Sequence, residues 1–308
     1  MSRLRADLIL LLAAMIWGST FVVQKLAFLD EAGEATAAVP EDGALGPLAF
    51  TGIRFLLGAL VVLPLALRET ARAEAPARPL DRLGFVLCGV LLFTGSITQQ
   101  VGIIGTSVTN AGFLTALYVP LVPLLGLFLL RRRPHWAVWP GVAGCTLGTW
   151  FLNGGDLTGM SQGDLWVTAG TVFWALHVIC VGTFVTRSGR PLTLACSQFV
   201  TVGTVGLIAA LLLEQPSWQS ISAAWFEIAW AGCLSVGIAF TLQVIGQRGA
   251  HPADAAIILS SEMVFAALAG AIVLGERLAP DQYAGAAIIL VSIIAVEVLP
   301  FLHKRKVR

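Results

Sequence analysis

Long apolar stretches recur along the whole chain, and only short polar segments separate them. An α-helix needs about 20 apolar residues to cross the hydrocarbon core of a membrane. Backbone polar groups cannot stay unpaired in lipid, and the alternation typical of a β-barrel strand is missing, so the pattern predicts helices. We place ten spans at residues 8–29, 47–67, 83–104, 108–130, 135–152, 164–186, 191–213, 225–247, 252–274 and 281–302. The chain is therefore expected to be an all-α polytopic membrane protein with ten transmembrane helices.

The start of the first span resembles a signal peptide, because residues 1–7 are followed by the apolar run 8–14. The apolar run continues through Trp17 to Leu29, however, and no A-x-A-like site stands where cleavage would need it. We expect this segment to remain in the protein as its first span.

The charges test the number of spans, because basic residues collect in cytoplasmic segments. With ten spans and a cytoplasmic N-terminus, the basic residues of the inside segments are Arg3, Arg5, Arg68, Arg72, Arg78, Arg82, Arg131, Arg132, Arg133, Arg187, Arg190, Arg248, Lys304, Arg305, Lys306 and Arg308. The charged residues of the outside loops are Arg277 and the acidic Asp30, Glu31, Glu34, Glu41, Asp42, Asp156, Glu214 and Glu276. Nine or eleven spans would place the basic C-terminal tail outside. The charges thus predict a bacterial inner-membrane protein with both termini in the cytoplasm.

Composition agrees with this class. The 308 residues are 57% hydrophobic and 12% charged, whereas soluble domains carry about a quarter charged residues. A net charge of +1 and the absence of a basic stripe argue against nucleic-acid binding. The cysteines all fall in apolar stretches, form no CxxC pair, and show no spacing with His typical of a metal site: they are Cys88, Cys145, Cys180, Cys196 and Cys233. We expect no metal and no cofactor.

The two halves of the chain match when it is shifted by about 144 residues. Polar and glycine residues coincide in this register: Arg54-Phe55 with Gln198-Phe199; Gln99, Gly102 and Gly105 with Gln243, Gly246 and Gly249; Asn110-Ala111 with Asp254-Ala255; Gly126 with Gly270; and Gly141 with Gly285. Trp17 coincides with Trp174 at a slightly larger shift. Chance resemblance between apolar helices is the alternative to duplication. We predict two five-helix repeats at residues 1–152 and 153–308, inverted relative to each other because five is odd.

Several segments resemble the EamA-type branch of the drug/metabolite transporter superfamily. They are Trp17-Gly18-Ser19-Thr20-Phe21, the element ending in Arg54-Phe55, and the stretch from Ser261-Glu262 to Leu274-Gly275-Glu276. The chain departs from the family pattern at Met263, where proline is usual, and at Arg131–Arg133, where a Gly-Glu pair is common. The resemblance implies export of small metabolites such as amino acids, or of drugs. A related branch carries nucleotide sugars, but its Lys-rich central site has no counterpart here.

Ionisable residues at membrane depth are costly, so each is a candidate functional residue. Glu262 lies near the middle of the ninth span and is a candidate proton carrier or partner of a substrate ammonium group. Its alternative role is a structural hydrogen bond. Lys25 and Arg54 lie in the outer parts of their spans and are candidates to attract a substrate carboxylate, or to pair with other groups. His177 is a proton-carrier candidate or a buried structural histidine.

Polar and aromatic residues complete the candidate site. Gln99, Gln243 and Asn110 offer donors and acceptors, although they could also only bridge helices. Trp17 and Trp174 fall in mid-span, away from the interfacial belt where Trp is usual, and could line a cavity for an apolar or aromatic substrate or only pack within the bundle. Tyr118 is a further candidate lining residue. Pro120 and Pro123 predict a kink in the fourth span.

These features predict a secondary transporter that exports small metabolites by alternating access, and not an enzyme. No G-x-x-x-x-G-K-[ST] motif is present, so nucleotide hydrolysis by this chain is not expected. Metabolite uptake, drug efflux and a channel are the alternatives within transport. An intramembrane enzyme or a scaffold is a more remote alternative, because the spans show no catalytic cluster. The expected partners are a small-molecule substrate and the lipid bilayer, and the short loops are compatible with a monomer.

Overall fold

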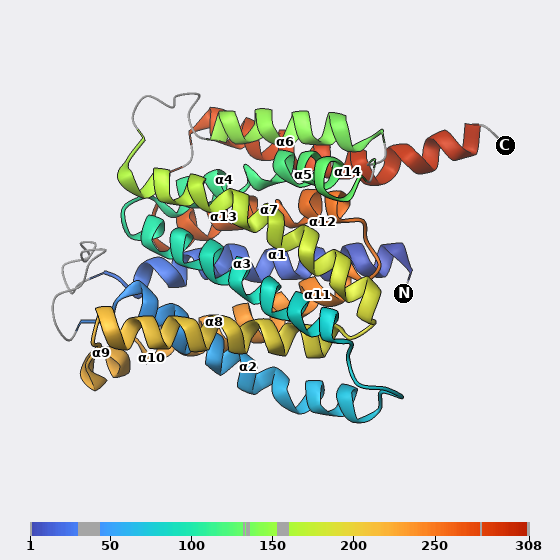
Figure 1. The fold of residues 1–308 in the computed structure, drawn as a ribbon. Coiled ribbons are helices and arrows are strands. Elements are labelled where there is room, and N and C mark those ends of the chain that lie inside the picture. The colour runs from blue at the N-terminus through green and yellow to red at the C-terminus, as the bar shows by residue number, and fades with distance from the viewer. Residues whose placement is uncertain are drawn as a thin grey trace.

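The structure is a computed structural model that describes residues 2–29, 44–131, 133, 136–152, 160–277 and 279–306. The described chain is helical (Figure 1). In chain order the helices are α1 (Arg3–Leu26), α2 (Pro47–Ala71), α3 (Pro79–Ile104), α4 (Val108–Thr115), α5 (Tyr118–Leu130), α6 (Val138–Leu152), α7 (Gln162–Ser188), α8 (Pro191–Leu213), α9 (Trp218–Ala223), α10 (Trp225–Trp230), the π-helix η1 (Ala231–Phe240), α11 (Thr241–Gln247), α12 (Pro252–Leu259), α13 (Glu262–Val273) and α14 (Pro280–Lys306).

Eight helical stretches of the described chain are long and apolar enough to cross a membrane, by length and composition. They are Arg3–Leu26, Pro47–Ala71, Pro79–Ile104, Val108–Leu129, Gln162–Ser188, Pro191–Leu213, Trp225–Gln247 and Pro252–Val273. These eight coincide with eight of the ten predicted spans, which confirms an all-helical polytopic membrane protein. The predicted fifth and tenth spans coincide with α6 and α14, which pack against each other. With 15 residues, α6 is about 22 Å long and is shorter than the hydrocarbon core.

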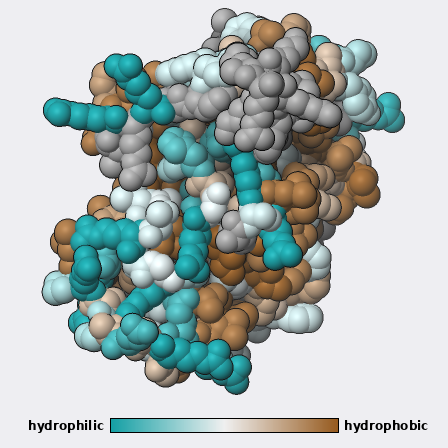
Figure 2. Space-filling model, turned by 90° about the vertical axis from the view of Figure 1, so that its right-hand side faces the viewer, coloured by the Kyte–Doolittle hydropathy of each residue, from teal (hydrophilic) through white to brown (hydrophobic). Residues whose placement is uncertain are grey.

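Both chain termini lie at the same end of the helix bundle, on the right in Figure 1. The connection between α2 and α3 lies at this end too. Figure 2 looks onto this end, where hydrophilic side chains gather, with apolar side chains along its right-hand edge. This distribution is that of a bundle whose apolar sides face lipid and whose end with the two termini faces water.

The packing of the first half of the chain is repeated in the second. α2 packs against η1 as α8 packs against α3, and α1 packs against η1 and α11 as α7 packs against α3. Likewise α4 contacts α13 as α12 contacts α5. In each comparison, the register predicted from the sequence relates the helices of one contact to those of the other. Helices of the two halves that correspond in sequence therefore have corresponding packing partners.

A reciprocal pair of carboxylate caps joins α2 and α8. Glu214, just after the end of α8, accepts hydrogen bonds from the backbone amides of Leu48 and Ala49 in the first turn of α2, both at 2.8 Å. Glu69, in the last turn of α2, accepts from the backbone amide and the hydroxyl of Thr193 in the first turn of α8, both at 2.7 Å. The first amides of a helix lack intrahelical partners, and an acidic side chain satisfies them. The two helices are therefore antiparallel, and each ends where the other begins.

Two spans are interrupted at corresponding positions. The break between α4 and α5 falls at Ala116, and the break between α12 and α13 falls at Ser260, 144 residues later. Pro120 has no amide to continue the first helix, as the predicted kink requires. In the second break the hydroxyl of Ser260 donates to the carbonyl of Ile257 at 2.6 Å instead. The usual proline is thus not needed for this geometry.

Candidate functional site

A cavity with an empty volume of about 520 Å³ lies among the interrupted spans and the helices around them. Both halves of the chain supply its walls. Its lining residues are Trp17, Phe21 and Gln24 of α1; Arg54 of α2; Ser96 and Gln99 of α3; Thr115 of α4; Tyr118 of α5; Trp174 and Val178 of α7; Ser235 and Phe240 of η1; Gln243 of α11; Leu259 of α12; and Glu262 of α13.

Seven of the ten residues predicted from the sequence line this cavity: Trp17, Arg54, Gln99, Tyr118, Trp174, Gln243 and Glu262. The structure brings them together from seven helices that are far apart in the chain. Lys25, Asn110 and His177 are not among the lining residues.

The Lys25 ammonium group binds the carboxyl end of α3. It donates hydrogen bonds to the backbone carbonyl oxygens of Ile103, Ile104 and Thr106 at 3.0, 2.8 and 3.0 Å. The last carbonyls of a helix lack intrahelical partners and carry partial negative charge, so a cation is favoured there. Lys25 therefore fixes the outer part of α1 against the end of α3.

The other two predicted residues also lie outside the cavity wall. The backbone amide of Asn110 donates to the hydroxyl of Ser107 at 3.0 Å, in the first turn of α4. His177 is fully buried, and its Nε2 lies 3.0 Å from Oε1 of Gln198. Its ring packs edge-on against the lining residue Trp174, with 6.0 Å between ring centroids. The imidazole thus supports the wall from behind.

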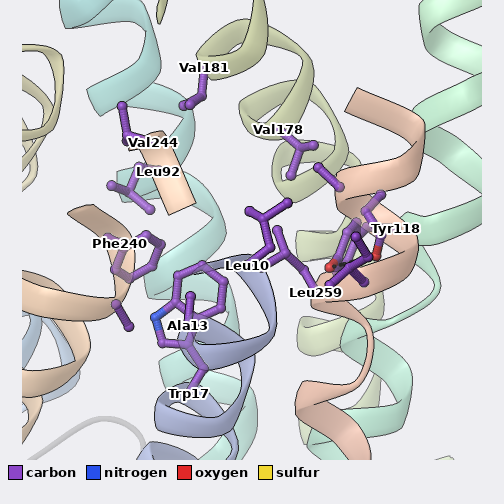
Figure 3. Packing of buried hydrophobic residues seen from close by; sticks show 14 of the residues in the cluster. Leu10, Ala13, Trp17, Leu92, Tyr118, Val178, Val181, Phe240, Val244 and Leu259 are labelled. Carbon is purple, nitrogen blue, oxygen red and sulfur yellow. Dashed lines mark hydrogen bonds between the residues drawn. The ribbon is translucent and has the colours of Figure 1, made fainter. Parts of the chain in front are cut away.

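Gly18 positions Trp17. A Cβ at Gly18 would lie 2.3 Å from Cβ of Phe265 and 2.8 Å from the carbonyl oxygen of Glu262, so α1 and α13 make backbone contact at this point. This crossing directs the neighbouring Trp17 toward Phe240, with 4.5 Å between ring centroids (Figure 3). The Trp17-Gly18 element therefore has two roles: Gly18 allows the close contact between α1 and α13, and Trp17 lines the cavity.

Phe240 is the centre of an aromatic wall. Its ring is stacked on that of Trp174, with 6.1 Å between centroids, and it lies 5.7 Å from the ring of Phe55. Figure 3 shows Trp17 and Phe240 side by side, with Leu259 and Tyr118 to the right of them. This side of the cavity suits an apolar or aromatic group.

One arginine and one glutamate face the cavity. Arg54 is 4% exposed, and its guanidinium carbon lies over the rings of Phe50 and Phe55 at 5.2 and 5.4 Å. Glu262 is 6% exposed and is the first residue of α13. Among the residues that the structure describes, no ion pair joins the two. Neither group is therefore satisfied by the other.

The cavity is also lined by buried polar atoms that have no hydrogen-bond partner in the described chain. They are Trp17 Nε1, Trp174 Nε1, Arg54 Nε, Gln24 Oε1, Gln243 Oε1 and Ser96 Oγ. Buried polar atoms in folded proteins nearly always have a partner. Gln99 and Thr115 illustrate the usual case, because Gln99 Nε2 donates to Thr115 Oγ1 at 3.0 Å. The remaining atoms keep unused hydrogen-bonding capacity in the residues that line the cavity.

Most lining residues form pairs related by the repeat. The pairs are Trp17 with Trp174, Phe21 with Val178, Ser96 with Phe240, Gln99 with Gln243, Thr115 with Leu259, and Tyr118 with Glu262. The cavity therefore lies between corresponding surfaces of the two halves, and its chemistry differs where a pair has diverged.

Sequence reasoning missed Phe21, Gln24, Ser96, Thr115, Val178, Ser235, Phe240 and Leu259. The repeat contained a usable signal for part of this set. Tyr118 and Glu262 were both predicted and are related by the 144-residue shift. Thr115 and Leu259 lie three residues before Tyr118 and Glu262, one helical turn away, and the same shift relates them to each other. They could therefore have been added to the prediction.

Known proteins resemble the chain along almost its full length. The model of the EamA-like transporter family matches residues 4–154 and again residues 161–297. An uncharacterized transporter of Archaeoglobus fulgidus is 32% identical over 302 residues, which cover 96% of this chain and 86% of the relative. The uncharacterized transporter YwfM of Bacillus subtilis is 25% identical and covers 96% and 94% of the two chains. A solved crystal structure shares the fold, with a TM-score of 0.73 at 20% identity over 96% of each chain. The chain therefore belongs to the EamA-like transporter family, with two copies of the family domain, and is a multi-pass membrane transporter and not an enzyme.

Proposed function

We propose that the protein is a secondary transporter of the bacterial inner membrane that exports small zwitterionic metabolites, such as amino acids, by alternating access. The observation that carries this proposal is the cavity, where Arg54 and Glu262 offer opposite charges without pairing with each other. Two buried charges are costly unless each has a partner. A molecule with a carboxylate and an ammonium group supplies both partners at once.

The hydrogen-bonding atoms of the cavity support the same ligand. The indole groups of Trp17 and Trp174 and the guanidinium group of Arg54 can only donate, which suits a carboxylate. Glu262 accepts when it is ionised, as do Gln24 Oε1 and Gln243 Oε1, and these groups suit an ammonium group. The aromatic wall around Phe240 would contact an apolar part of the substrate.

The proposed architecture is ten spans in two inverted five-helix repeats, with α6 and α14 as the fifth and tenth spans. The antiparallel caps between α2 and α8 and the repeated packing pairs support it. Inverted repeats provide two related conformations that open a central site to opposite sides of the membrane. The basic residues at the end that bears both termini support a cytoplasmic position for that end.

Glu262 supplies a mechanism of coupling. A single carboxylate can hold a proton or a substrate ammonium group, but not both, so proton entry and substrate exit become linked. The outward movement of the zwitterion would then be driven by the inward proton gradient.

Drug efflux is a second candidate function, because the aromatic wall next to Glu262 also suits an aromatic cation. Arg54 distinguishes the two candidates, since it would repel a cation and attract a zwitterion. A substrate survey with both classes of compound therefore tests the assignment.

The test is transport by proteoliposomes that contain the purified protein, with labelled amino acids inside and an imposed pH gradient. We expect gradient-stimulated export by the native protein. Glu262→Gln should abolish the stimulation, because its amide cannot release a proton at physiological pH. Arg54→Gln should weaken amino-acid binding by roughly ten- to a hundredfold, since a hydrogen bond to a charged group contributes about 1.5–3 kcal/mol.

Glu227→Gln on α10, outside the cavity lining, is the matched control and should behave like the native protein. Each variant is first shown to keep its thermal melting temperature in detergent. Normal gradient-stimulated export by Glu262→Gln would refute the proton-carrier role. Transport of aromatic cations without transport of any amino acid would favour drug efflux.

A further inference from the structure

Ser96 and Phe240 both line the cavity and occupy corresponding positions of the two halves, 144 residues apart. On the wall formed by the second half, the ring of Phe240 fills this position. It is 6% exposed and packs against Trp17, Trp174 and Phe55, as described above. The second half therefore presents a rigid apolar surface at this position.

The wall formed by the first half is different, because a small polar side chain replaces the ring. Ser96 is 1% exposed, and its hydroxyl has no hydrogen-bond partner in the described chain. The adjacent Gly95 packs against the indole ring of Trp174: a Cβ added to this glycine would lie 3.2 Å from the ring. α3 is therefore in close contact with the ring of Trp174 beside Ser96, and the first half presents a hydroxyl to the cavity at the position where the second half presents a ring.

The Ser96 hydroxyl differs from that of Thr115, the other hydroxyl that α3 and α4 bring to the cavity. Thr115 Oγ1 donates to the carbonyl of Ala111 at 2.7 Å and accepts from Gln99, so its capacity is used within the protein. Buried hydroxyl groups in helices often donate to the preceding turn in this way. Ser96 does not, although Thr98 on the same helix donates to the carbonyls of Thr94 and Gly95.

We propose that Ser96 binds a hydroxyl group on the side chain of the substrate, so that the cavity selects hydroxylated zwitterions over their apolar counterparts. The inference rests on the proposed zwitterion transport and adds its selectivity. Arg54 and Glu262 hold the two charges common to all amino acids. The side chain of the substrate then contacts Ser96. A hydroxyl group there gains a hydrogen bond, whereas an apolar group of the same shape leaves the serine hydroxyl unpaired.

The experiment measures binding to the purified full-length protein in lipid nanodiscs by titration calorimetry. The probes are two pairs that differ by one hydroxyl: L-threonine with L-valine, and L-tyrosine with L-phenylalanine. At least one of the two pairs should fit the cavity in size. For that pair we expect the hydroxylated amino acid to bind roughly five- to tenfold more tightly than its apolar counterpart. Ser96→Ala should remove this preference while both members still bind, and Ser96→Thr should retain it.

Two further variants make the result specific. Ser292→Ala removes a buried serine hydroxyl of α14 outside the cavity lining and should leave the preference unchanged. Ser235→Ala removes the second serine of the cavity and tests whether that hydroxyl, and not Ser96, carries the preference. If Ser235→Ala abolishes the preference and Ser96→Ala does not, the assignment to Ser96 is wrong. If the native protein binds both members of each pair equally, the selectivity proposal fails while zwitterion binding stands. If it binds no amino acid, both proposals fail.

Discussion

Gly18 shows how one residue without a side chain positions the cavity. Backbone contact between α1 and α13 occurs at this glycine, and any Cβ there would overlap Phe265. Because Trp17 and Glu262 lie directly beside the contact, a change in the distance between these helices would move two lining residues together.

Gly18→Ala is therefore expected to separate α1 from α13 and to destabilise the protein by about 1–3 kcal/mol, as overpacking of a buried contact does. The thermal melting temperature in detergent should fall, and amino-acid binding should weaken. Gly126→Ala in α5 is the matched control, because an added Cβ there meets nothing within 4 Å. Its better helix propensity should leave stability unchanged or slightly raised. Equal melting temperatures for the two variants would contradict the close contact at Gly18.

At the residue scale, ionisable and amide side chains at membrane depth were useful predictors of the cavity, because burying them without a use is costly. The same rule selected Lys25 and His177, whose partners are carbonyls of α3 and the side chain of Gln198. A single sequence does not show such partners, because they depend on helix packing. Phe240 and Leu259 carry no polar signal, so a cavity wall built from them is indistinguishable from core.

At the scale of elements, the caps between α2 and α8 depend on charged side chains at helix ends. Glu214 is 7% exposed, and burial raises its pKa above the usual value of 4.5, while the hydrogen bonds from Leu48 and Ala49 act in the opposite direction. The folded protein thus holds this proton more tightly than the unfolded chain does. The stability linked to this proton is fully present below pH 4.5 and is lost as the pH rises through the folded pKa.

Glu214→Gln should accordingly flatten the pH dependence of the melting temperature between pH 4.5 and neutrality, because it removes the titrating group. Glu214→Ala should also remove the cap and lower stability by about 1–2 kcal/mol. Glu74→Ala, an exposed glutamate between α2 and α3, serves as the control and should change neither quantity. Unchanged pH profiles in both Glu214 variants would show that this carboxyl does not titrate with folding.

The spans themselves were predictable because their apolar length is set by the membrane. Their interruptions were predictable only in part. Pro120 indicated the break after α4. The corresponding break at Ser260 has no proline, and there the serine hydroxyl forms a hydrogen bond to the backbone. The π-helix Ala231–Phe240 had no signal in the hydrophobic pattern either, since an apolar helix looks the same at either winding.

At the scale of the whole molecule, orientation in the membrane remains a prediction from the charges. The connection between α2 and α3 and the segment around α9 lie at opposite ends of the bundle (Figure 1). Glu74 and Gln219 are exposed positions in these two places. The native cysteines all lie in helices and are buried or half-buried, so they give a low background for thiol labelling.

In intact cells, a membrane-impermeant maleimide should label Gln219→Cys at once and Glu74→Cys only after the membrane is permeabilised. The physical reason is the retention of basic segments in the cytoplasm. The unmodified protein, treated in parallel, measures the background from the native thiols. The reverse pattern would place both termini outside and would overturn the proposed topology.

The reciprocal caps of Glu69 and Glu214 have a consequence for the origin of the chain. The amides that the two glutamates cap correspond in the 144-residue register, Leu48 with Leu192 and Ala49 with Thr193, whereas the glutamates themselves are offset from it by one residue. A free unit with a glutamate at the end of its second helix could form both caps by pairing that helix in antiparallel fashion with the same helix of a second copy. Fusion of two such units into one gene would preserve this self-pairing and release other positions to specialise, as Arg54 and its counterpart Gln198 illustrate.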